Sequence, residues 1–391
     1  MEDLFEYYVA NNACPTYADF NSDLELLNYD LLRRNVFYRL FFPVSWFPGK
    51  KVLVFGPDTG ENELIFAKWG AELTLVEPNS GAHSFIHKYF EKFNMSGSLK
   101  QIVQTHLLDF NTDDQYDLID AEGFIYTVKP NSSWINKTAA CLRKEGYLVI
   151  HYMERYGSFM ELLLKAIYNR VKLQGHDIEG IEIAKILFLN KWNSISHTRK
   201  IESWFMDVIM NPFVRMHYFI DACDLLKDTF DGGFRIHSSW PNYRDTNEVY
   251  WIKSQLDKEM NLRVDLKYIE QSRLSHLLGC KFFLFEENDE IKSNLKTLVE
   301  LADKLIDLWT KEACESAVEC IDNIMVQIKM MSLYSDGKDV GEVNEIMNMF
   351  KKIFYYMGLD EVDELIDFCQ KDKIFISTWG VPTHYAIFQR N

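Results

Sequence analysis

The residues with the clearest chemical pattern form a glycine turn, followed by an acid twenty-one positions after the first glycine. Gly56, Pro57, Asp58 and Gly60 lie in the turn, and Glu77 is the acid. Glycines let the backbone approach a ligand closely, a helix N-terminus offers free N–H groups, and a carboxylate can accept protons from two ribose hydroxyls. The pattern therefore predicts a site for an adenosine-containing cofactor.

A second group of polar residues could act on an acceptor molecule. Glu122, His151 and Tyr152 each lie at the end of an apolar run. A carboxylate or an imidazole within hydrogen-bond reach can take the proton of an attacking hydroxyl. We expect these three to be the candidate catalytic residues. Each also has a structural interpretation, because a strand-end carboxylate can cap a helix, a histidine is often a satisfied polar group, and tyrosines commonly pack in cores.

The elements that position the turn and the acid follow one another along the chain. Residues 52–55 form an apolar run that predicts a buried strand, residues 61–69 have helical spacing that ends at Gly70, and residues 73–76 predict a second strand. This order is one right-handed unit of a doubly wound parallel sheet. The spacing of the glycines argues against the Gly-x-Gly-x-x-Gly motif of dinucleotide binding.

Later segments continue the alternation of strands and helices. Residues 101–108 predict a strand that ends at Asp109 and Phe110, and residues 116–122 predict the next strand. A helix over about 132–142 and a strand over 147–152 follow, while residues 30–42 predict a helix before the first strand. The carboxyl ends of these strands would bring the acids and His151 to one edge of the sheet.

Residues 30–155 resemble the class I methyltransferases that depend on S-adenosylmethionine. Gly56 and Gly60 match the first and last glycines of that family's turn, and Glu77 matches its ribose-binding acid. Two positions depart, because Val54 stands where the family usually has an acid and Asp58 where it has its middle glycine. The resemblance implies S-adenosyl-L-methionine as cofactor. The expected cofactor-binding residues are Gly56, Pro57, Asp58, Gly60, Glu77, Asp109, Phe110 and Glu122.

Composition limits the class of partner. The 391 residues include 58 acidic and 42 basic ones, for a net charge of −16, and no basic run is present to follow a nucleic acid. The seven cysteines are scattered and lack a Cys-x-x-Cys pair, so neither a metal site nor a disulfide framework is expected. We expect a globular cytoplasmic protein without a transmembrane segment or signal peptide.

The expected fold is α/β: a doubly wound, mostly parallel, seven-stranded sheet with an N-terminal helical segment and a helical C-terminal appendage. We expect a methyltransferase domain over residues 1–254, with a helical insertion at about 158–233, and an accessory region over 255–391. Two hairpins could close the sheet: residues 234–240 with 249–254, which we favour, or residues 374–377 with 384–388. Apolar stripes in the C-terminal helices would be buried within the chain or in a homodimer.

These features predict an enzyme that transfers a methyl group to a small polar acceptor. A looser resemblance of residues 238–253 to surface-glycan methyltransferases points to a sugar or glycan intermediate. Two alternatives stay open. Asp58 could have damaged the cofactor turn, leaving a degenerate binding subunit, or the helical appendage could dock a polypeptide for protein side-chain methylation.

Overall fold

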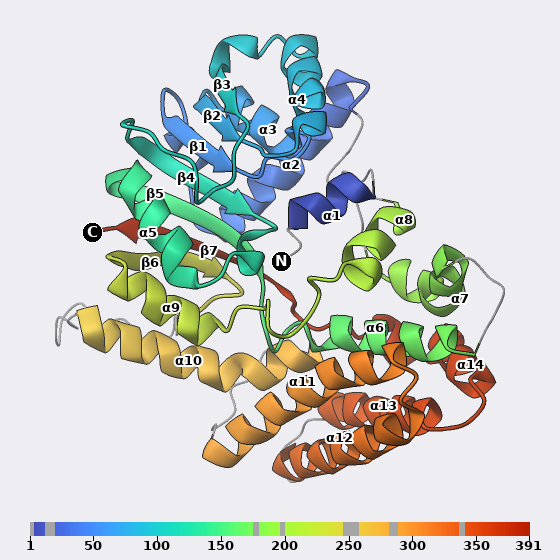
Figure 1. The fold of residues 1–391 in the computed structure, drawn as a ribbon. Coiled ribbons are helices and arrows are strands. Elements are labelled where there is room, and N and C mark those ends of the chain that lie inside the picture. Colours follow the sequence, from blue (N-terminus) through green and yellow to red (C-terminus); the bar gives the residue numbers. More distant parts are fainter. Residues whose placement is uncertain are drawn as a thin grey trace. The chain divides into compact units, whose positions relative to one another are not determined.

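The computed structural model describes residues 4–11, 20–174, 180–195, 200–244, 258–280, 288–335 and 341–391 (Figure 1). The chain separates into two compact units. The sheet unit contains residues 1–153, 222–266 and 384–391, and the helical unit contains residues 154–221 and 267–383. Each unit is therefore built from segments that are far apart in the sequence.

The sheet unit is organised around a seven-stranded sheet, as the sequence predicts. Its strands are β1 (Lys51–Phe55), β2 (Glu72–Val76), β3 (Leu99–Val103), β4 (Tyr116–Glu122), β5 (Leu142–Met153), β6 (Phe234–Trp240) and β7 (Thr383–Arg390). Their spatial order is β3-β2-β1-β4-β5-β7-β6. β1 pairs in parallel with β2 and β4, and β6 pairs antiparallel with β7. The order in which strands are added to the sheet reverses between β1 and β4, and in open α/β sheets ligands bind at such a point.

The last two strands of the sheet correct our expectation of a closing hairpin. β6 pairs with β7 from the C-terminus of the chain, so one strand comes from each of the two segments that we predicted as hairpins. Residues 374–377, predicted as a strand, belong to helix α15 (Lys373–Ser377), where Asp372 caps the first turn by accepting the N–H of Phe375 at 2.9 Å. Residues 249–254 lie outside the described residues. The region that we assigned to an accessory unit therefore contributes a strand to the sheet.

Helices of the sheet unit follow local sequence signals. They are α1 (Leu4–Ala10), α2 (Asp23–Arg39), α3 (Glu61–Lys68), α4 (Ser80–Lys92), α5 (Asn131–Cys141) and α9 (Ala222–Asp231), with 3₁₀ turns at Val44–Trp46, Ser96–Ser98 and Ile125–Thr127. α2 begins seven residues before the helix that we predicted from residue 30, because Ser22 and Glu25 form a capping box. α3 ends before Gly70, whose φ of 91° suits a glycine at a helix end.

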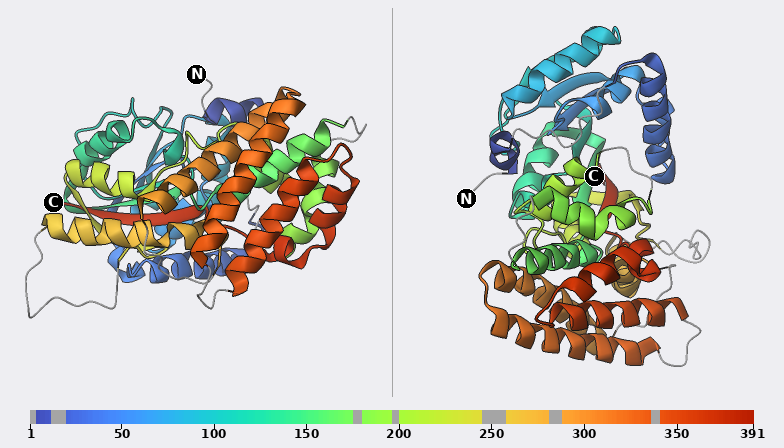
Figure 2. Two further views of the ribbon diagram at one scale, coloured as in Figure 1. Left: turned by 90° about the horizontal axis from the view of Figure 1, so that it is seen from below. Right: turned by 90° about the vertical axis from the view of Figure 1, so that its right-hand side faces the viewer.

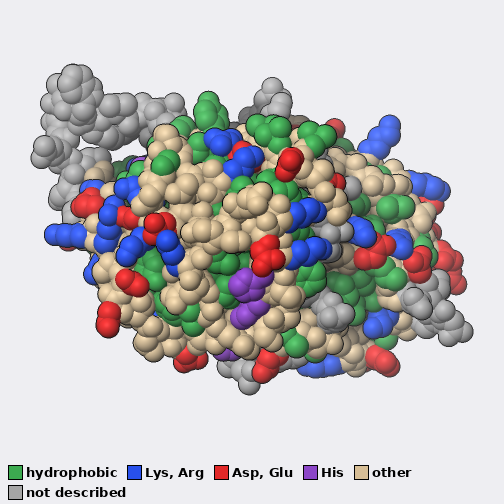
Figure 3. Space-filling view, turned by 90° about the horizontal axis from the view of Figure 1, so that it is seen from above, with side chains coloured by type: hydrophobic (Ala, Val, Ile, Leu, Met, Phe, Trp, Pro, Cys, Tyr) green, Lys and Arg blue, Asp and Glu red, His purple; other side chains and the backbone are tan. Residues whose placement is uncertain are grey.

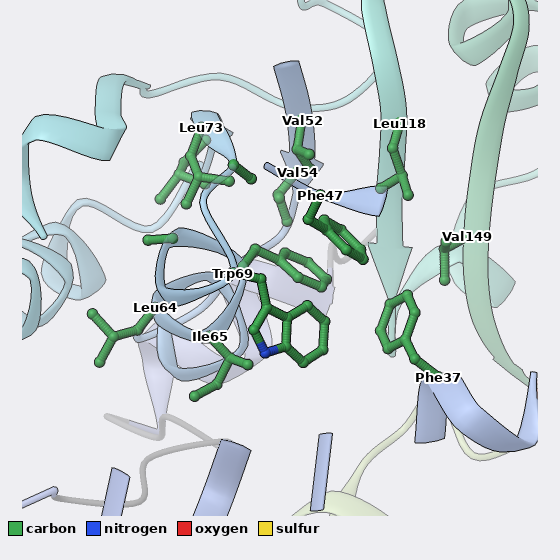
Figure 4. Packing of buried hydrophobic residues seen from close by; sticks show 14 of the residues in the cluster. Phe37, Phe47, Val52, Val54, Leu64, Ile65, Trp69, Leu73, Leu118 and Val149 are labelled. Carbon is green, nitrogen blue, oxygen red and sulfur yellow. The ribbon is translucent and has the colours of Figure 1, made fainter. Parts of the chain in front are cut away.

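An aromatic core joins α2 and α3 to one face of the sheet. Phe37, from α2, meets the edge of Trp69 with ring centroids 5.3 Å apart, and Phe47 stacks on Phe66 at 5.2 Å. Figure 4 shows Phe47 and Trp69 close to the β-strand residues that share this cluster. Burial of several large rings stabilises this face and fixes the position of α2 against the sheet.

The helical unit packs its amphipathic helices on one another. Its helices are α6 (Phe159–Lys172), α7 (Gly180–Trp192), α8 (Ile201–Trp204), α11 (Asp289–Thr310), α12 (Cys314–Ser335), α13 (Gly341–Met357), α14 (Asp363–Lys371) and α15, with a π-helical turn at Phe205–Met210. α10 (Lys258–Leu278) has residues in both units. From the predicted stripe of α11, Leu295, Leu298 and Leu305 are buried within the chain. Their burial therefore does not require a homodimer.

Two observations bear on partners. Among the described residues, no helix combines the length and the apolar character needed to cross a bilayer. On the described part of the face shown in Figure 3, acidic and basic side chains are interspersed rather than gathered into one basic track. A basic track of that kind is what a nucleic-acid backbone would require.

Candidate active site

The glycine turn after β1 has the backbone conformation that its sequence predicts. Gly56 and Gly60 have φ values of 67° and 90°, in the left-handed region that favours glycine. Asp58 also has a positive φ, 49°, at the position of the family's middle glycine. Aspartate tolerates this region better than most residues, so the turn keeps its shape without the glycine. The N–H of Gly60 donates to the carbonyl of Pro57 at 3.0 Å and closes the turn.

The position of Gly56 also requires a glycine for steric reasons. A Cβ atom placed there would lie 2.9 Å from two ring carbons of Phe124, which follows β4. Phe124 in turn contacts Phe5 of α1, with ring centroids 5.7 Å apart. The α1 helix and the β4 loop therefore both approach the turn.

Glu77 lies at the carboxyl end of β2 and holds the turn in place. Its carboxylate accepts the backbone N–H of Asp58 at 3.0 Å and that of Asn79 at 2.7 Å. The side chain is only 1% exposed. Burial, with a smaller contribution from the charge of Asp58, raises the pKa of Glu77 to about 8, although the two N–H donors oppose the rise. A carboxylate has about four acceptor positions, so capacity for two further hydrogen bonds remains.

Asp109 and Phe110 follow β3 at a greater distance than we expected. β3 ends at Val103, not at residue 108, and a turn over residues 106–109 leads to the pair. Asp109 is exposed, whereas the ring of Phe110 is buried against Phe55 at the end of β1, with centroids 5.7 Å apart. Phe110 therefore lies near the glycine turn, although the strand before it is short.

A buried ion pair lies at the end of β4. Arg33, from α2, donates to both carboxylate oxygens of Glu122, at 2.9 and 2.6 Å. Asp120, two residues earlier on the same face of the strand, lies 3.8 Å from the Arg33 guanidinium. Burial opposes ionisation of Glu122, but Arg33 outweighs it and lowers the pKa of that carboxyl. A bidentate pair of this kind keeps Glu122 charged and fixed in orientation.

Two further acids around Arg33 are held neutral. Burial, followed by the charge of Glu122, raises the pKa of Asp120 well above its usual range, and burial does the same for Glu63 of α3. Buried polar atoms without a hydrogen-bond partner among the described residues gather here: Arg33 Nε, Glu63 Oε2 and Asp120 Oδ1. Such atoms are costly to leave unsatisfied, so the cluster suits a ligand with polar groups.

His151 and Tyr152 face different surroundings although they are neighbours on β5. His151 is the parallel register partner of Glu122, is partly exposed, and stacks on Tyr385 of β7 with centroids 4.6 Å apart. Tyr152 is fully buried, and its hydroxyl is hydrogen-bonded to that of Tyr243. The structure thus brings His151 and Glu122 together and places Tyr152 within the interior.

The Tyr152 hydroxyl belongs to a buried chain of hydrogen bonds. Tyr243 also bonds to Nδ1 of His384 at 2.6 Å, and its backbone N–H donates to Ser239 Oγ at 2.8 Å. These residues connect β5, β6 and β7, which are adjacent only in the folded sheet. Their role in the geometry is to tie the antiparallel end of the sheet together.

Sequence reasoning did not identify Arg33, Glu63 and Asp120 as members of this site. One signal was available: Asp120 and Glu122 are two residues apart in the predicted strand over residues 116–122, so they share a face, and two acids on one buried face require a nearby cation. The arginine that supplies the charge is 89 positions away from Glu122 and on a helix. Periodicity alone could not select it from its neighbours Arg34 and Arg39.

Comparison with known proteins places the chain in a family. The model of a family described as "Methyltransferase domain" matches residues 29–238, more than half of the chain. This match includes the glycine turn, Glu77, the Arg33–Glu122 pair and His151. No curated protein matches the chain.

Solved structures similar to parts of the chain are methyltransferases. CcbJ from Streptomyces caelestis is 14% identical over 29% of this chain and 52% of its own, with a TM-score of 0.27. The glycopeptide N-methyltransferase MtfA with sinefungin is 14% identical over 33% and 51%, with a TM-score of 0.28. NodS from Bradyrhizobium japonicum WM9 is 18% identical over 38% and 74%, with a TM-score of 0.30.

The alignments with CcbJ and MtfA span about half the length of those proteins. The family assignment therefore rests on the family model and on the strand order around the glycine turn. On this basis the chain belongs to the matched methyltransferase family and has the fold of the class I, Rossmann-like, S-adenosylmethionine-dependent methyltransferases.

Proposed function

We propose that this protein transfers a methyl group from S-adenosyl-L-methionine to a hydroxyl of a small polar acceptor, with His151 as the general base. The observation that carries the proposal is the pairing of a partly exposed histidine with a fixed, ionised carboxylate at adjoining strand ends. A sugar or glycan intermediate is the acceptor that the sequence around residues 238–253 suggests, and residues 245–253 of that segment lie outside the described residues.

The cofactor supplies an electrophilic methyl group on its sulfonium. The residues around the glycine turn fit such a group, because Gly56 and Gly60 have left-handed backbones and Glu77 retains acceptor positions. We assign the adenosine to the turn, its ribose to Glu77, and its adenine to Asp109 and Phe110. The unsatisfied polar atoms near Arg33 would then serve the polar groups of a bound molecule.

The other residues prepare the acceptor for attack. His151 would take the hydroxyl proton as the oxygen attacks, and the negative charge of Glu122 would stabilise the resulting imidazolium. Glu122 itself is a poor base, because Arg33 lowers its pKa and occupies both of its oxygens. Tyr152 is fully buried, so we assign it to support of the strand rather than to contact with the acceptor.

Calorimetric titration with S-adenosylmethionine tests the cofactor assignment. Glu77→Ala removes the acceptor positions assigned to the ribose hydroxyls and the hydrogen bonds to the N–H groups of Asp58 and Asn79 that hold the turn, so the affinity should fall at least tenfold. Glu72→Ala is the matched control, because Glu72 begins the same strand and its carboxylate forms an exposed ion pair with Lys100 at 3.7 Å. Unchanged affinity in the Glu77 variant would refute the assignment.

A test of the base separates binding from chemistry. His151→Ala should bind S-adenosylmethionine as tightly as the wild type, while methyl transfer to a panel of labelled sugars and polyols should fall by about 10²–10⁴-fold. Activity that persists at the wild-type rate in this variant would show that the acceptor needs no base at His151. A methylated product that is an amine rather than an ether would overturn the proposed acceptor atom.

Two observations favour a second candidate function, a binding subunit without catalysis. Both Glu77 oxygens already accept backbone N–H groups, and Asp58 stands where the family has a glycine. If the turn is closed against the cofactor, the wild type should show no binding in the titration and Asp58→Gly should restore it. Binding by the wild type would exclude this alternative.

A further inference from the structure

The outer face of α2 carries exposed apolar side chains at regular spacing. They are Leu24 (64% exposed), Leu27 (46%), Leu31 (58%), Tyr38 (80%) and, just beyond the helix, Phe41 (76%). The intervals of three, four, seven and three residues are those of the a and d positions of a heptad repeat, with Arg34 at the d position in between. In the right-hand view of Figure 2, α2 is the medium-blue helix along one side of the sheet unit. We call this row the α2 seam.

The α2 seam is distinct from the face that α2 packs on the sheet. Leu26, Arg33, Phe37 and Leu40 form that inner face and are buried. A helix in a monomer normally has one apolar stripe and one polar face. α2 has two apolar stripes, and the described residues of the chain cover only the inner one.

Phe41 supplies independent evidence that the seam is built for contact. It follows the C-terminus of α2 in a Schellman motif, in which Phe42 N–H donates to Phe37 O at 2.9 Å and Phe41 N–H donates to Tyr38 O at 3.0 Å. This position usually holds glycine because its φ is positive, and for Phe41 φ is 52°. A bulky aromatic residue there is strained, and its ring is exposed rather than buried within the chain. Neither local propensity nor internal packing explains its presence.

We propose that the α2 seam binds the α2 seam of a second copy of this chain in an antiparallel, two-fold arrangement. Antiparallel helices pair each a position with a d position of the partner. If the two-fold axis passes between residues 32 and 33 of both helices, three kinds of layer form. Leu24 meets the partner's Phe41, Leu27 meets the partner's Tyr38, and Leu31 meets the partner's Arg34. Each large aromatic residue is then opposite a leucine, and every layer appears twice, as a two-fold interface requires.

Charges along α2 favour the same direction of pairing. The exposed acids Asp23 and Glu25 are at its N-terminus, and exposed Arg39 is at its C-terminus. Antiparallel pairing brings these opposite charges to the same end of the seam, whereas parallel pairing would place like charges together. In the central layer, Leu31 lies opposite the partner's Arg34. The Arg34 guanidinium is already paired with Asp30 of its own helix at 2.8 Å, so its aliphatic stem can cover Leu31 across the interface.

A membrane surface is a poorer occupant than a second copy. An interfacial helix is usually rich in lysine and arginine on its polar face. α2 carries acids in its first turn, and the chain has a net charge of −16. Anionic lipid would therefore repel the protein.

Sedimentation equilibrium of the full chain tests the proposal. The wild type should form a dimer below about 100 μM, and Leu27→Glu should raise the dimer Kd at least tenfold. Leu32→Glu is the matched control: Leu32 is on the same helix and 51% exposed but lies off the seam, so its Kd should not change. A wild type that stays monomeric, or equal effects of the two variants, would overturn the proposal.

Phe41→Gly separates association from folding. Glycine relieves the positive φ, so the thermal midpoint of the variant, measured at a concentration where both proteins are monomeric, should rise. Its dimer Kd should rise as well, by at least tenfold. A variant that dimerises as the wild type does would show that Phe41 is not part of the interface.

Cysteine cross-linking tests the direction of pairing. Leu27→Cys combined with Tyr38→Cys should form a covalent dimer under oxidation, and Leu27→Cys alone should not exceed the background of the native cysteines. A cross-link in the single variant would indicate parallel pairing and refute the antiparallel seam. Co-sedimentation of a monomeric protein with vesicles of phosphatidylcholine and phosphatidylglycerol would instead assign the seam to a lipid surface.

Discussion

Removal of the Arg33 guanidinium should destabilise the sheet unit because it leaves Glu122 buried without a cation. Arg33→Met keeps most of the side-chain volume and the contacts with Phe37 and Phe66, whose rings lie 5.3 and 5.2 Å from the guanidinium carbon. Breaking a buried pair by removing one partner costs about 3–5 kcal/mol. Glu122→Gln should cost less, because Asp120 lies 3.8 Å from Arg33 and can ionise once the neighbouring charge is gone.

The pH dependence of this cost distinguishes charge from packing. Arg33 lowers the pKa of Glu122 in the folded protein, so the stabilisation by the pair is present above about pH 4.3 and is lost as the pH falls. In Arg33→Met the carboxyl loses its cation and takes up a proton more readily. The difference in unfolding free energy between the wild type and the variant should therefore be smaller at pH 4.5 than at pH 7.

Urea unfolding followed by circular dichroism at both pH values is the assay. Arg235→Met is the matched control, since Arg235 is 53% exposed and pairs with exposed Glu145 at 3.3 Å, a contact worth about 0–1 kcal/mol. A cost for Arg33→Met that equals the control, or that does not change with pH, would refute the assignment of Arg33 and Glu122 as a buried, ionised pair.

Further predictions concern the cofactor turn and the sheet. Asp58→Gly should raise stability by up to about 1 kcal/mol and preserve cofactor affinity, because Asp58 has a φ of 49°; a lower melting temperature would contradict this. Glu77→Gln should become more stable relative to the wild type as the pH rises from about 4.5 to 8. In that range the raised pKa of Glu77 favours the unfolded wild type, where the acid ionises freely, whereas glutamine does not titrate. A difference in melting temperature that stays constant with pH would contradict this. A fragment ending at Ser254 lacks β7 and should be insoluble, so a folded fragment that binds S-adenosylmethionine would show that β7 is dispensable.

The sequence alone was sufficient to predict the first half of the sheet. The runs at β1, β2 and β4, the glycine turn and the position of Glu77 at a strand end all appear as local patterns of apolar periodicity, glycine and acid. These features are local because a strand–turn–helix unit is stabilised by contacts between neighbours in the chain. The class of fold and the family follow from their order.

Other features depended on contacts between distant segments. The sheet closes through β6 and β7, whose pairing joins Phe234 to Arg390, and no turn signal in the sequence marks a partner so far away. The pairing of Arg33 with Glu122 likewise depends on how α2 packs on the sheet, which the aromatic core around Phe37 and Trp69 determines. Periodicity specifies which face of an element is apolar, whereas the neighbour that covers the face is selected by packing and charge in three dimensions. His151 and Tyr152 show the consequence: adjacent residues on one strand meet Tyr385 and Tyr243 respectively, and only the folded sheet distinguishes the partly exposed one from the buried one.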